Sequence, residues 1–309
     1  MKITCIGSGV FSLALAKSLS KKKENQIVIW THDKEVSQMA LNENKLLFDG
    51  KKVYKPQNIL VTSSLSEALQ NTSSIFLLVS SLYVKEIVLK LKKDYKVNIP
   101  IFIGSKGLLS EKPYYFTHFV KKALNAKKIA FFAGPNLAKD LFNDAEVFIT
   151  VATKNKSAFS YFQSIVPRKI HLEEMKEEKV LELASVLKNI YAIGAGMAYA
   201  KCPYRSTVFS YLTEAYKEYN QILYETLNYS GEVIYTGTLG DFFLTGSSFT
   251  SRNFSYGRLL VKTKKEAKLF SHCYTVEGKN NLEILPMMVK KMNRFPLLYQ
   301  IWQENRLVK

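Results

Sequence analysis

Glycines near the start of the chain stand where a phosphate group could bind. A predicted strand at residues 3–6 runs into Gly7-Ser8-Gly9-Val10-Phe11-Ser12, and residues 10–20 have a helical pattern. In such a unit the first glycine permits a tight turn, and the second lets a pyrophosphate approach the backbone at the helix N-terminus. Ser12 holds the third position of the motif and is still small enough for close helix–strand packing. The pattern predicts a dinucleotide site, with a glycine turn that binds nothing as the alternative.

The end of the second predicted strand, residues 27–30, would contact the adenosine ribose of such a dinucleotide. An acid there favours a free 2′-hydroxyl, and basic groups accommodate a 2′-phosphate. The chain reads Thr31-His32-Asp33-Lys34 at this point. These signals conflict, so NAD and NADP both stay open.

Polar residues interrupt apolar surroundings in four further segments. They are Ser105-Lys106-Gly107, Gly134-Pro135-Asn136-Leu137-Ala138, Leu187-Lys188-Asn189, and Leu239-Gly240-Asp241 followed by Ser251-Arg252-Asn253. Lys188 is the most informative, because the helical face around it is apolar or small. A lysine there either extends outwards, forms a simple ion pair or is held for chemistry.

The elements that must position these residues fall into two groups. Strands are predicted at residues 3–6, 27–30, 59–61, 75–79, 101–104, 129–132 and 147–151, with helical patterns between several of them, for example at 10–20 and 83–93. Such alternation indicates a parallel sheet with helices on both faces. From residue 177 onward the periodicity is mostly helical. We therefore expect an α/β protein: an N-terminal Rossmann-type dinucleotide-binding domain, residues 1–176, followed by an all-α C-terminal domain, residues 177–309.

Composition and charge exclude several classes of protein. With 47% hydrophobic and 23% charged residues, the chain is neither disordered nor fibrous. The net charge of +18 comes from basic residues dispersed in short runs, with no basic tail and no recognisable nucleic-acid motif. We expect a solvated surface that steers small anionic ligands and binds no specific nucleic acid.

The cysteines and the apolar runs indicate in which cellular compartment the protein works. Cys5, Cys202 and Cys273 are an odd, scattered set, which argues against a disulfide framework and against a metal site. The first residues lack a signal-peptide pattern, and no run approaches the roughly 18 apolar residues that span a bilayer. We expect a soluble cytoplasmic protein with no membrane span. A homodimer is compatible with the sequence, but no feature establishes one.

Taken in order, these segments resemble the bacterial NAD(P)-dependent glycerol-3-phosphate dehydrogenase family over nearly the whole chain. The counterparts of the family's motifs are Gly7-Ser8-Gly9, Lys106-Gly107, Gly134-Pro135-Asn136-Leu137-Ala138, Lys188-Asn189, Gly240-Asp241, Ser251-Arg252-Asn253 and Glu277-Gly278. Any one of them could arise by chance, whereas the ordered set at compatible spacing is specific.

The resemblance implies an enzyme that reduces dihydroxyacetone phosphate to glycerol 3-phosphate with NAD(P)H, supplying phospholipid synthesis. It implies that Lys188 is the catalytic acid/base. The implied substrate contacts are Lys106, Gly134, Asn136, Lys188, Asp241, Ser251, Arg252 and Asn253. The implied cofactor positions are Gly7, Gly9, Val10, Phe11, Ser12, His32, Lys106, Ala138, Arg252, Thr275 and Glu277.

The chain departs from the family pattern chiefly at cofactor and loop positions. The departures are Val10, Phe11, Ser12, His32, Asn136, Leu137 and Thr275. The charged catalytic set is intact, so we expect activity to be retained. Two alternatives stay open: a related two-domain dehydrogenase acting on a hydroxy or keto acid, and a dinucleotide-binding or basic interaction protein without catalysis.

Overall fold

The computed structural model describes residues 1–308, which form two compact units. Unit 1 contains Met1–Ser105, Pro113–Phe132 and Asn136–Glu178. Unit 2 contains the segments Lys106–Lys112 and Ala133–Pro135 together with the chain from Lys179 onward. The main division therefore falls between Glu178 and Lys179, and two short segments of the first half of the chain belong to the second unit.

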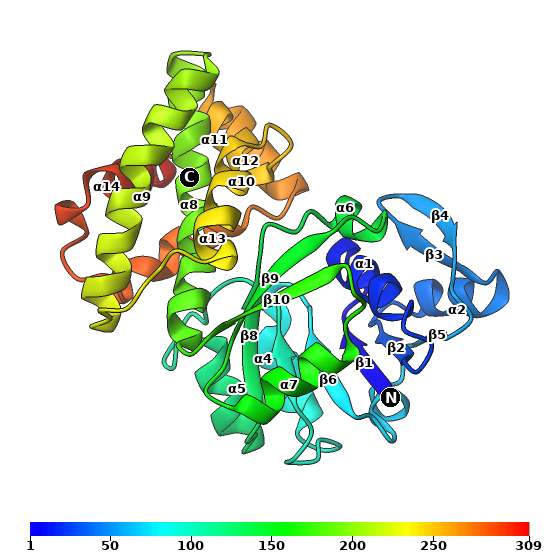
Figure 1. The fold of residues 1–309 in the computed structure, drawn as a ribbon. Coiled ribbons are helices and arrows are strands. Elements are labelled where there is room, and N and C mark those ends of the chain that lie inside the picture. The colour runs from blue at the N-terminus through cyan, green and yellow to red at the C-terminus, as the bar shows by residue number, and fades with distance from the viewer. Residues whose placement is uncertain (309) are drawn as a thin grey trace. The chain divides into compact units, whose positions relative to one another are not determined.

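Unit 1 is built on an eight-stranded sheet with the order β10-β9-β8-β7-β6-β1-β2-β5 (Figure 1). Its strands are β1 (Lys2–Ile6), β2 (Gln26–Trp30), β5 (Ile59–Thr62), β6 (Ser74–Leu77), β7 (Ile101–Ile103), β8 (Ile129–Ala133), β9 (Val147–Ala152) and β10 (Ile170–Met175). The pairs β1–β2, β2–β5, β1–β6, β6–β7, β7–β8 and β9–β10 are parallel. The expected parallel sheet is confirmed.

The helices of unit 1 connect successive strands. They are α1 (Val10–Leu19), α2 (Lys34–Asn42), α3 (Leu65–Leu69), α4 (Val84–Leu91), α5 (Phe116–Leu124), α6 (Ala138–Phe142) and α7 (Lys156–Ile165). The chain also forms a separate antiparallel hairpin of β3 (Lys45–Phe48) and β4 (Lys51–Tyr54), which the sequence did not predict.

Apolar strand residues and helix faces build the core of unit 1. Phe76, Phe102, Phe132 and Phe162 come from three strands and α7, and their rings meet with centroids 4.6–5.8 Å apart. Aromatic pairs at such distances add to the stabilisation from buried area. This cluster holds the sheet whose strand ends carry the candidate sites of unit 1.

The strand order reverses at β1. From β1 the chain builds outward through β2 and β5, then returns to the other side of β1 at β6. Ligands of open α/β sheets bind at the carboxyl ends of the strands where the order reverses in this way. Gly7 directly follows β1, so the glycine turn lies at that point.

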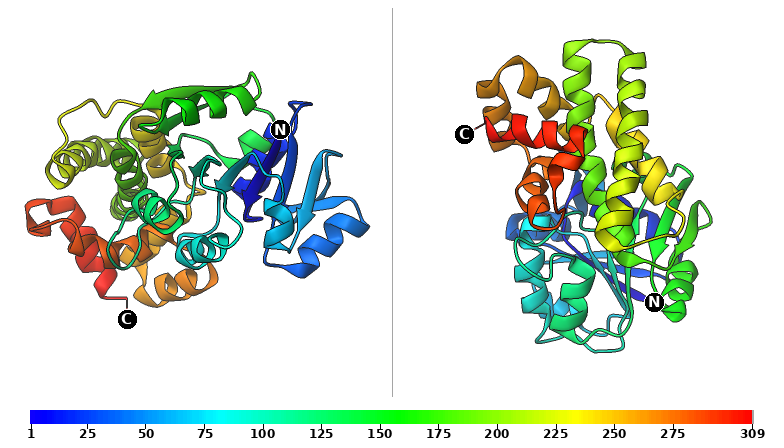
Figure 2. Two further views of the ribbon diagram at one scale, coloured as in Figure 1. Left: turned by 90° about the horizontal axis from the view of Figure 1, so that it is seen from below. Right: turned by 90° about the vertical axis from the view of Figure 1, so that its left-hand side faces the viewer.

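Unit 2 is helical, as expected (Figures 1 and 2). Its helices are α8 (Glu178–Lys201), α9 (Arg205–Leu227), α10 (Asp241–Ser247), α11 (Arg252–Lys262), α12 (Lys264–Cys273), α13 (Glu277–Ile284) and α14 (Pro296–Arg306). A π-helical turn, Thr236–Gly240, leads into α10. The fold class, a Rossmann-type domain followed by a helical domain, is confirmed.

Helix α8 is the core of unit 2. Every residue from Val180 to Met197 is buried. Glycines let α11 approach it closely, because a Cβ on Gly196 would collide with the carbonyl oxygen of Phe254, and one on Gly257 with that of Ile193. The small residues of this segment therefore serve helix packing, as the sequence suggested.

Helix α8 also corrects one expectation about apolar runs. Among residues 1–308 it is the one helix long and apolar enough to cross a membrane by length and composition, with an 18-residue window of mean hydropathy 1.2. All of that window is buried inside the protein. The core helix of a soluble protein passes the same test, so the finding is weak support for a membrane span.

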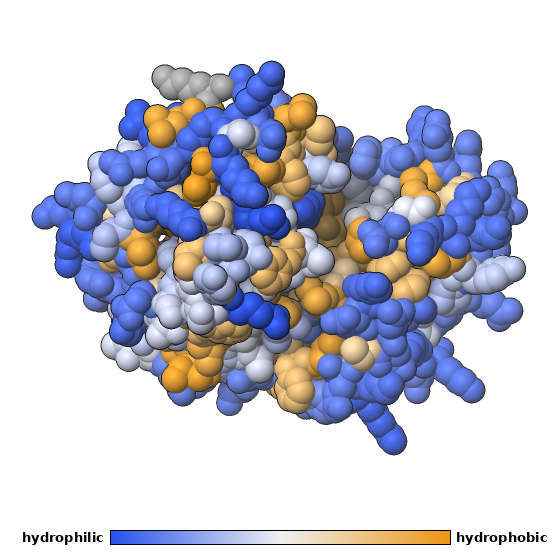
Figure 3. Space-filling model, turned by 90° about the horizontal axis from the view of Figure 1, so that it is seen from above, coloured by the Kyte–Doolittle hydropathy of each residue, from blue (hydrophilic) through white to orange (hydrophobic). Residues whose placement is uncertain are grey.

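The surface is as hydrophilic as the charge suggested. Figure 3 shows hydrophilic residues spread widely over the face in view, with apolar residues in smaller groups between them. Several of the lysines form exposed ion pairs, such as Lys90 with Glu86 and Lys217 with Glu214. Exposed pairs of this kind contribute little to stability.

Candidate active site

The glycine turn of unit 1 has the conformation that a dinucleotide site requires. Gly7 has φ +120°, and a Cβ there would lie 3.0 Å from the carbonyl oxygen of Leu78, so a side chain would be strained. Around Gly9, in contrast, no described atom lies within 4 Å of the position of a Cβ. The first glycine is needed for the turn, and the second leaves open space above the backbone.

Ser12 has a specific function in this turn. Its side chain is buried, and its hydroxyl donates a 2.6 Å hydrogen bond to the carbonyl oxygen of Gly7. The serine at the third motif position therefore ties the first turn of α1 to the glycine turn. This departure from the usual fingerprint therefore stabilises the glycine turn.

The N-terminus of α1 fits an anionic group. Gly9 is the N-cap residue, and no side chain of residues 1–308 caps the helix there. The first N–H groups of a helix have no partner within it and carry partial positive charge. Val10 is 40% exposed, whereas the ring of Phe11 packs 6.4 Å from that of Phe132. A pyrophosphate at this end of α1 would meet backbone N–H groups that no side chain of residues 1–308 caps.

The structure gives separate surroundings to the acidic and the basic residue at the end of β2, where a dinucleotide ribose would bind. Asp33 is the N-cap of α2, and its Oδ1 accepts hydrogen bonds from the N–H groups of Glu35 and Val36 at 2.9 and 3.2 Å. His32 is exposed. The carboxylate thus has a structural task, while the imidazole is free to meet a ligand from solvent.

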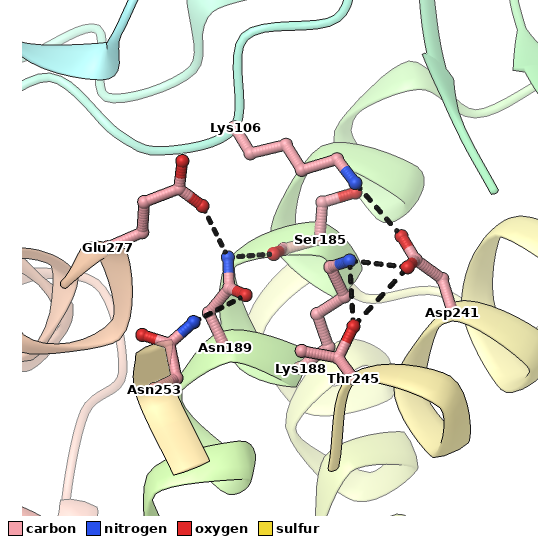
Figure 4. A network of polar contacts seen from close by, with 8 residues as sticks. All are labelled: Lys106, Ser185, Lys188, Asn189, Asp241, Thr245, Asn253 and Glu277. Carbon is pink, nitrogen blue, oxygen red and sulfur yellow. Dashed lines mark hydrogen bonds and ion pairs between the residues drawn. The ribbon is translucent and has the colours of Figure 1, made fainter. Parts of the chain in front are cut away.

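The main polar cluster lies in unit 2 and joins three elements (Figure 4). Lys188 of α8 lies with its Nζ 2.5 Å from Oδ1 of Asp241, the first residue of α10. Lys106, on the segment after β7, lies with its Nζ 3.2 Å from Oδ2 of the same carboxylate. Thr245, one turn after Asp241, accepts a 3.1 Å hydrogen bond from Lys188. Two ammonium groups therefore share one carboxylate.

Burial decides the electrostatics of this cluster. The side chains of Lys188 and Asp241 are 5% and 4% exposed, and that of Lys106 is 23% exposed. Burial lowers the pKa of Lys188 to about 7, the charge of Lys106 lowers it too, and Asp241 opposes both. Burial is the largest single influence on Lys106 and lowers its pKa, yet that pKa is raised, because Asp241 together with the nearby Lys188 and Glu277 outweighs the burial. The two lysines shield Asp241, whose pKa stays below its ordinary value despite its burial.

These pKa values give the two lysines different chemistry. Lys188 can gain or lose a proton near neutral pH, as a general acid or base must. Lys106 keeps its charge and can balance that of an anion. The interpretation of Lys188 as a lysine that merely extends outwards is therefore wrong, because its ammonium is buried against a carboxylate.

A second network fixes the face of α8 that carries Lys188. Asn189 donates to Oε2 of Glu277 at 3.0 Å and to the carbonyl oxygen of Ser185 at 3.3 Å. Its Oδ1 accepts from Nδ2 of Asn253 at 2.9 Å, and Oδ1 of Asn253 accepts from the N–H of Gly278. Asn189 therefore ties α8 to α11 and α13, and Asn253 has a clear positioning function.

The remaining predicted positions differ in exposure and in local task. Ser251 is the N-cap of α11, where its hydroxyl accepts from the N–H of Phe254. Arg252 and Thr275 are exposed. Gly134 is buried, and Oδ1 of Asn136 is buried without a hydrogen-bond partner among residues 1–308. Ala138 begins α6.

The predicted positions fall into two sets. Those in unit 1 are Gly7, Gly9, Val10, Phe11, Ser12, His32, Asn136 and Ala138; those in unit 2 are Lys106, Gly134, Lys188, Asp241, Ser251, Arg252, Asn253, Thr275 and Glu277. Within unit 2, contacts join Lys106, Lys188 and Asp241 in one cluster and link Asn253 and Glu277 through Asn189. In the part of the chain that the structure describes, no three His, Cys, Asp or Glu side chains gather as metal ligands would.

Thr245 was missed in the sequence. It lies four residues after Asp241, and this spacing places two residues on one face of a helix. The spacing could have suggested it, but threonine is too common in helices for spacing alone to mark it. Only the contact with Lys188 assigns it to the cluster.

A Rossmann-type unit with an open glycine turn, joined to a helical unit that buries a lysine of near-neutral pKa, defines a nicotinamide-dependent dehydrogenase. Residues 2–159 match the N-terminus of NAD-dependent glycerol-3-phosphate dehydrogenase, and residues 179–306 match its C-terminus. The chain belongs to the NAD-dependent glycerol-3-phosphate dehydrogenase family.

Individual relatives agree with this assignment. The chain is 28% identical to a glycerol-3-phosphate dehydrogenase [NAD(P)+] of Mesoplasma florum, over 98% of this chain and 93% of that protein. The corresponding protein of Fusobacterium nucleatum is also 28% identical, over 97% and 91%. The crystal structure of glycerol-3-phosphate dehydrogenase from Coxiella burnetii has the same fold, with a TM-score of 0.86 at 22% identity over 99% of this chain and 94% of that one.

Proposed function

We propose that the protein is a glycerol-3-phosphate dehydrogenase that reduces dihydroxyacetone phosphate to sn-glycerol 3-phosphate with NADH or NADPH. The observation that carries the proposal is the buried Lys188–Asp241 pair with Lys106 on the second carboxylate oxygen. Family membership supports the reaction, and the names of the relatives support the substrate. The product would supply the glycerol phosphate backbone of phospholipids.

In this proposal Lys188 moves the proton. A reduced nicotinamide, when bound, would supply the hydride for the carbonyl carbon of the substrate. The electron pair of the C=O bond passes to the carbonyl oxygen, which takes a proton from Nζ of Lys188. Of the three N–H donors of this ammonium, two are directed to Asp241 and Thr245, and one is left for the substrate. In the reverse direction the neutral amine takes the proton from the alcohol.

The neighbours of Lys188 stabilise charge. Asp241 orients both ammonium groups, since each of its carboxylate oxygens faces one of them. Lys106 stays charged and would offset negative charge on the substrate oxygen or phosphate. Arg252, exposed at the start of α11, would bind the phosphate. The further substrate contacts in this proposal are Ser251, Asn253, Gly134 and Asn136.

The nicotinamide cofactor would be held at the glycine turn. Gly7 and Gly9 would bring the backbone N–H groups of α1 to the pyrophosphate, and His32 would face the adenosine ribose. The further cofactor contacts in this proposal are Val10, Phe11, Ser12, Lys106, Ala138, Arg252, Thr275 and Glu277. Both NADH and NADPH fit, because Asp33 caps α2 and His32 is exposed.

The first prediction concerns Lys188 itself. Lys188→Ala should lower kcat for dihydroxyacetone phosphate reduction by about 10²–10⁴-fold, the usual contribution of a positioned proton donor. The rate is followed by the absorbance of the reduced nicotinamide, with NADH and with NADPH. Lys217→Ala is the matched control, because Lys217 is an exposed lysine of unit 2 paired with Glu214. An active, correctly folded Lys188→Ala protein would contradict the assigned role.

We also propose that the enzyme works in the cytoplasm. All three cysteines are free thiols, and Cys202 and Cys273 are exposed, which suits a reducing compartment. The excess of positive charge suits anionic substrates and cofactors. Fractionation of the cells that make the protein would test the location.

A further inference from the structure

One buried hydroxyl beside the polar cluster lacks a hydrogen-bond partner. Ser185 of α8 is fully buried, and no group among residues 1–308 hydrogen-bonds its Oγ. It lies three residues before Lys188 and four before Asn189, so all three side chains share one face of the helix. Leaving a buried hydroxyl unpaired destabilises a fold, because the group loses its hydrogen bonds to water and gains none in return. The protein keeps that unpaired group at the edge of its active-site cluster.

The direction of this side chain points to its partner. In Figure 4 the Ser185 side chain extends toward the Lys106 ammonium and the carboxylate of Asp241. Lys106 is the most exposed of the three charged side chains of the cluster, at 23%, and its ammonium ends a flexible side chain. An anionic ligand that draws Lys106 away from Asp241 would uncover the hydroxyl.

We propose that the Ser185 hydroxyl is a further substrate contact, which hydrogen-bonds the free hydroxyl group of the three-carbon substrate. This inference rests on the proposed function. Three residues of α-helix advance about 4.5 Å, so Ser185 lies within one turn of the amine that serves the carbonyl oxygen. In dihydroxyacetone phosphate the free hydroxyl and the carbonyl are on adjacent carbons, which matches this separation. The phosphate at the other end needs charged partners instead.

Such a contact would make the enzyme selective. A site that hydrogen-bonds a substrate hydroxyl rejects the analogue lacking it, because its own polar group is then left unpaired. Hydroxyacetone phosphate, with a methyl group in place of the hydroxymethyl group, is that analogue. The wild-type protein should therefore prefer dihydroxyacetone phosphate, and Ser185 should account for part of the preference.

The test compares kcat/KM for the two ketones in the wild type and in Ser185→Ala. We expect the preference for dihydroxyacetone phosphate to fall at least ten-fold in the variant, through KM for that ketone, with KM for the cofactor unchanged. The Tm should stay level or rise, because an unpaired hydroxyl has been removed. Ser185→Cys keeps the size of the side chain but hydrogen-bonds weakly, so it should behave like Ser185→Ala.

The matched control is Ser247→Ala. The Ser247 hydroxyl donates to the carbonyl oxygen of Phe243 within α10, so its loss should leave the preference unchanged. An unchanged preference in both folded Ser185 variants, or a loss of Tm with normal kinetics, would overturn the proposal for Ser185 alone. A wild-type protein that reduces neither ketone would instead overturn the proposed function, and the Ser185 contact with it.

Discussion

At the scale of residues, the electrostatics of the cluster follow from three charges that lie close together at a largely buried position. Lys188 and Asp241 alone would form a neutral pair, and the pKa of the lysine would be higher. The additional charge of Lys106 and the burial of the site push that pKa down to about 7. A buried pair of this kind gives little net stability. In the proposed mechanism its value lies in a proton that can move near neutral pH.

The pH dependence of the reaction should report this balance. In the reductive direction Lys188 must be protonated, so kcat should be level below pH 7 and fall above it. In the oxidative direction the amine must be neutral, so kcat should rise as the pH increases through about 7. Measurement at saturating substrate separates this titration from that of the substrate phosphate, whose second pKa is about 6.

Two variants should shift the pH at which the reductive kcat falls, and they should shift it in opposite directions. The charge of Asp241 raises the pKa of Lys188, so Asp241→Asn should shift the fall in kcat to lower pH. The charge of Lys106 lowers that pKa, so Lys106→Gln should shift the fall to higher pH. Lys188→Arg serves as the reference. A guanidinium stays charged, so the fall in kcat above pH 7 should disappear from its pH profile. Shifts of the same sign in both variants would refute this electrostatic account.

The sequence predicted the charged residues of the site better than its hydroxyls. A lysine in an apolar helical face is conspicuous, so Lys188 could be singled out, and Asp241 was noted in a separate polar segment, but their ion pair appears only in the structure. Thr245 could not, because hydroxyl residues are ordinary in helices and only its contact with Lys188 assigns it to the cluster. Ser185, whose role is a proposal, was equally inconspicuous, because the sequence does not show that its hydroxyl is buried without a partner. Ser12 was recognised as a departure, yet its hydrogen bond to Gly7 depends on a turn that a sequence pattern does not describe.

At the scale of elements, continuous apolar runs made the buried strands predictable. β10 was missed because it is an edge strand, in which His171, Glu173 and Glu174 break the apolar pattern. The hairpin of β3 and β4 was missed because lysines begin both strands and Tyr54 is exposed. The grouping of residues 106–112 and 133–135 with unit 2 depends on contacts distant in sequence, which no local pattern contains.

Two glycines of different elements should respond in opposite ways to a methyl group. Gly257→Ala forces α11 away from α8, because the new Cβ collides with a backbone oxygen, and we expect a loss of about 1–3 kcal/mol in the free energy of unfolding. Gly9→Ala points its Cβ into open space, so stability should change by less than about 1 kcal/mol.

The KM for the cofactor should also differ between Gly9→Ala and Gly257→Ala. The Cβ of Gly9→Ala stands where the pyrophosphate approaches, so KM for NAD(P)H should rise by about ten-fold or more. Gly257→Ala should keep a normal cofactor KM at temperatures where it is folded. Urea unfolding and steady-state kinetics provide the two measurements. Normal cofactor KM in Gly9→Ala would contradict the assignment of the glycine turn.

A buried carboxylate joins three helices of unit 2. Oε1 of Glu218 in α9 accepts from the Tyr191 hydroxyl of α8 at 2.7 Å, and its two oxygens accept from the N–H groups of Leu297 and Leu298 at the start of α14. Glu218→Ala would leave these donors unpaired, so we expect a loss of about 3–5 kcal/mol in the free energy of unfolding. Glu218→Gln, which retains one acceptor oxygen, should lose less. Equal, small losses in both variants would show that water replaces the carboxylate.

At the scale of the whole molecule, family membership and the intact cluster favour a catalyst over the alternative of a basic interaction protein. The net charge of +18 then acts on the encounter with substrate. A field of that sign raises the local concentration of an anionic ligand, and salt screens it over about 10 Å at 0.1 M. The surface lysines would thus affect the rate of capture and leave the chemical step unchanged.

The salt dependence of kcat/KM tests this effect. Between about 0.01 M and about 0.5 M salt, kcat/KM for dihydroxyacetone phosphate should fall by about ten-fold, while kcat stays level. Dihydroxyacetone, which lacks the phosphate, is the matched uncharged substrate, and its kcat/KM should hardly change when the cofactor is saturating. Lys217→Glu should lower kcat/KM for the phosphorylated ketone at low salt and have no effect at high salt, because this exposed residue lies outside the proposed site and acts on the substrate through the long-range field. A fall of equal size for both ketones would assign the effect to the protein's own stability and not to attraction of the substrate.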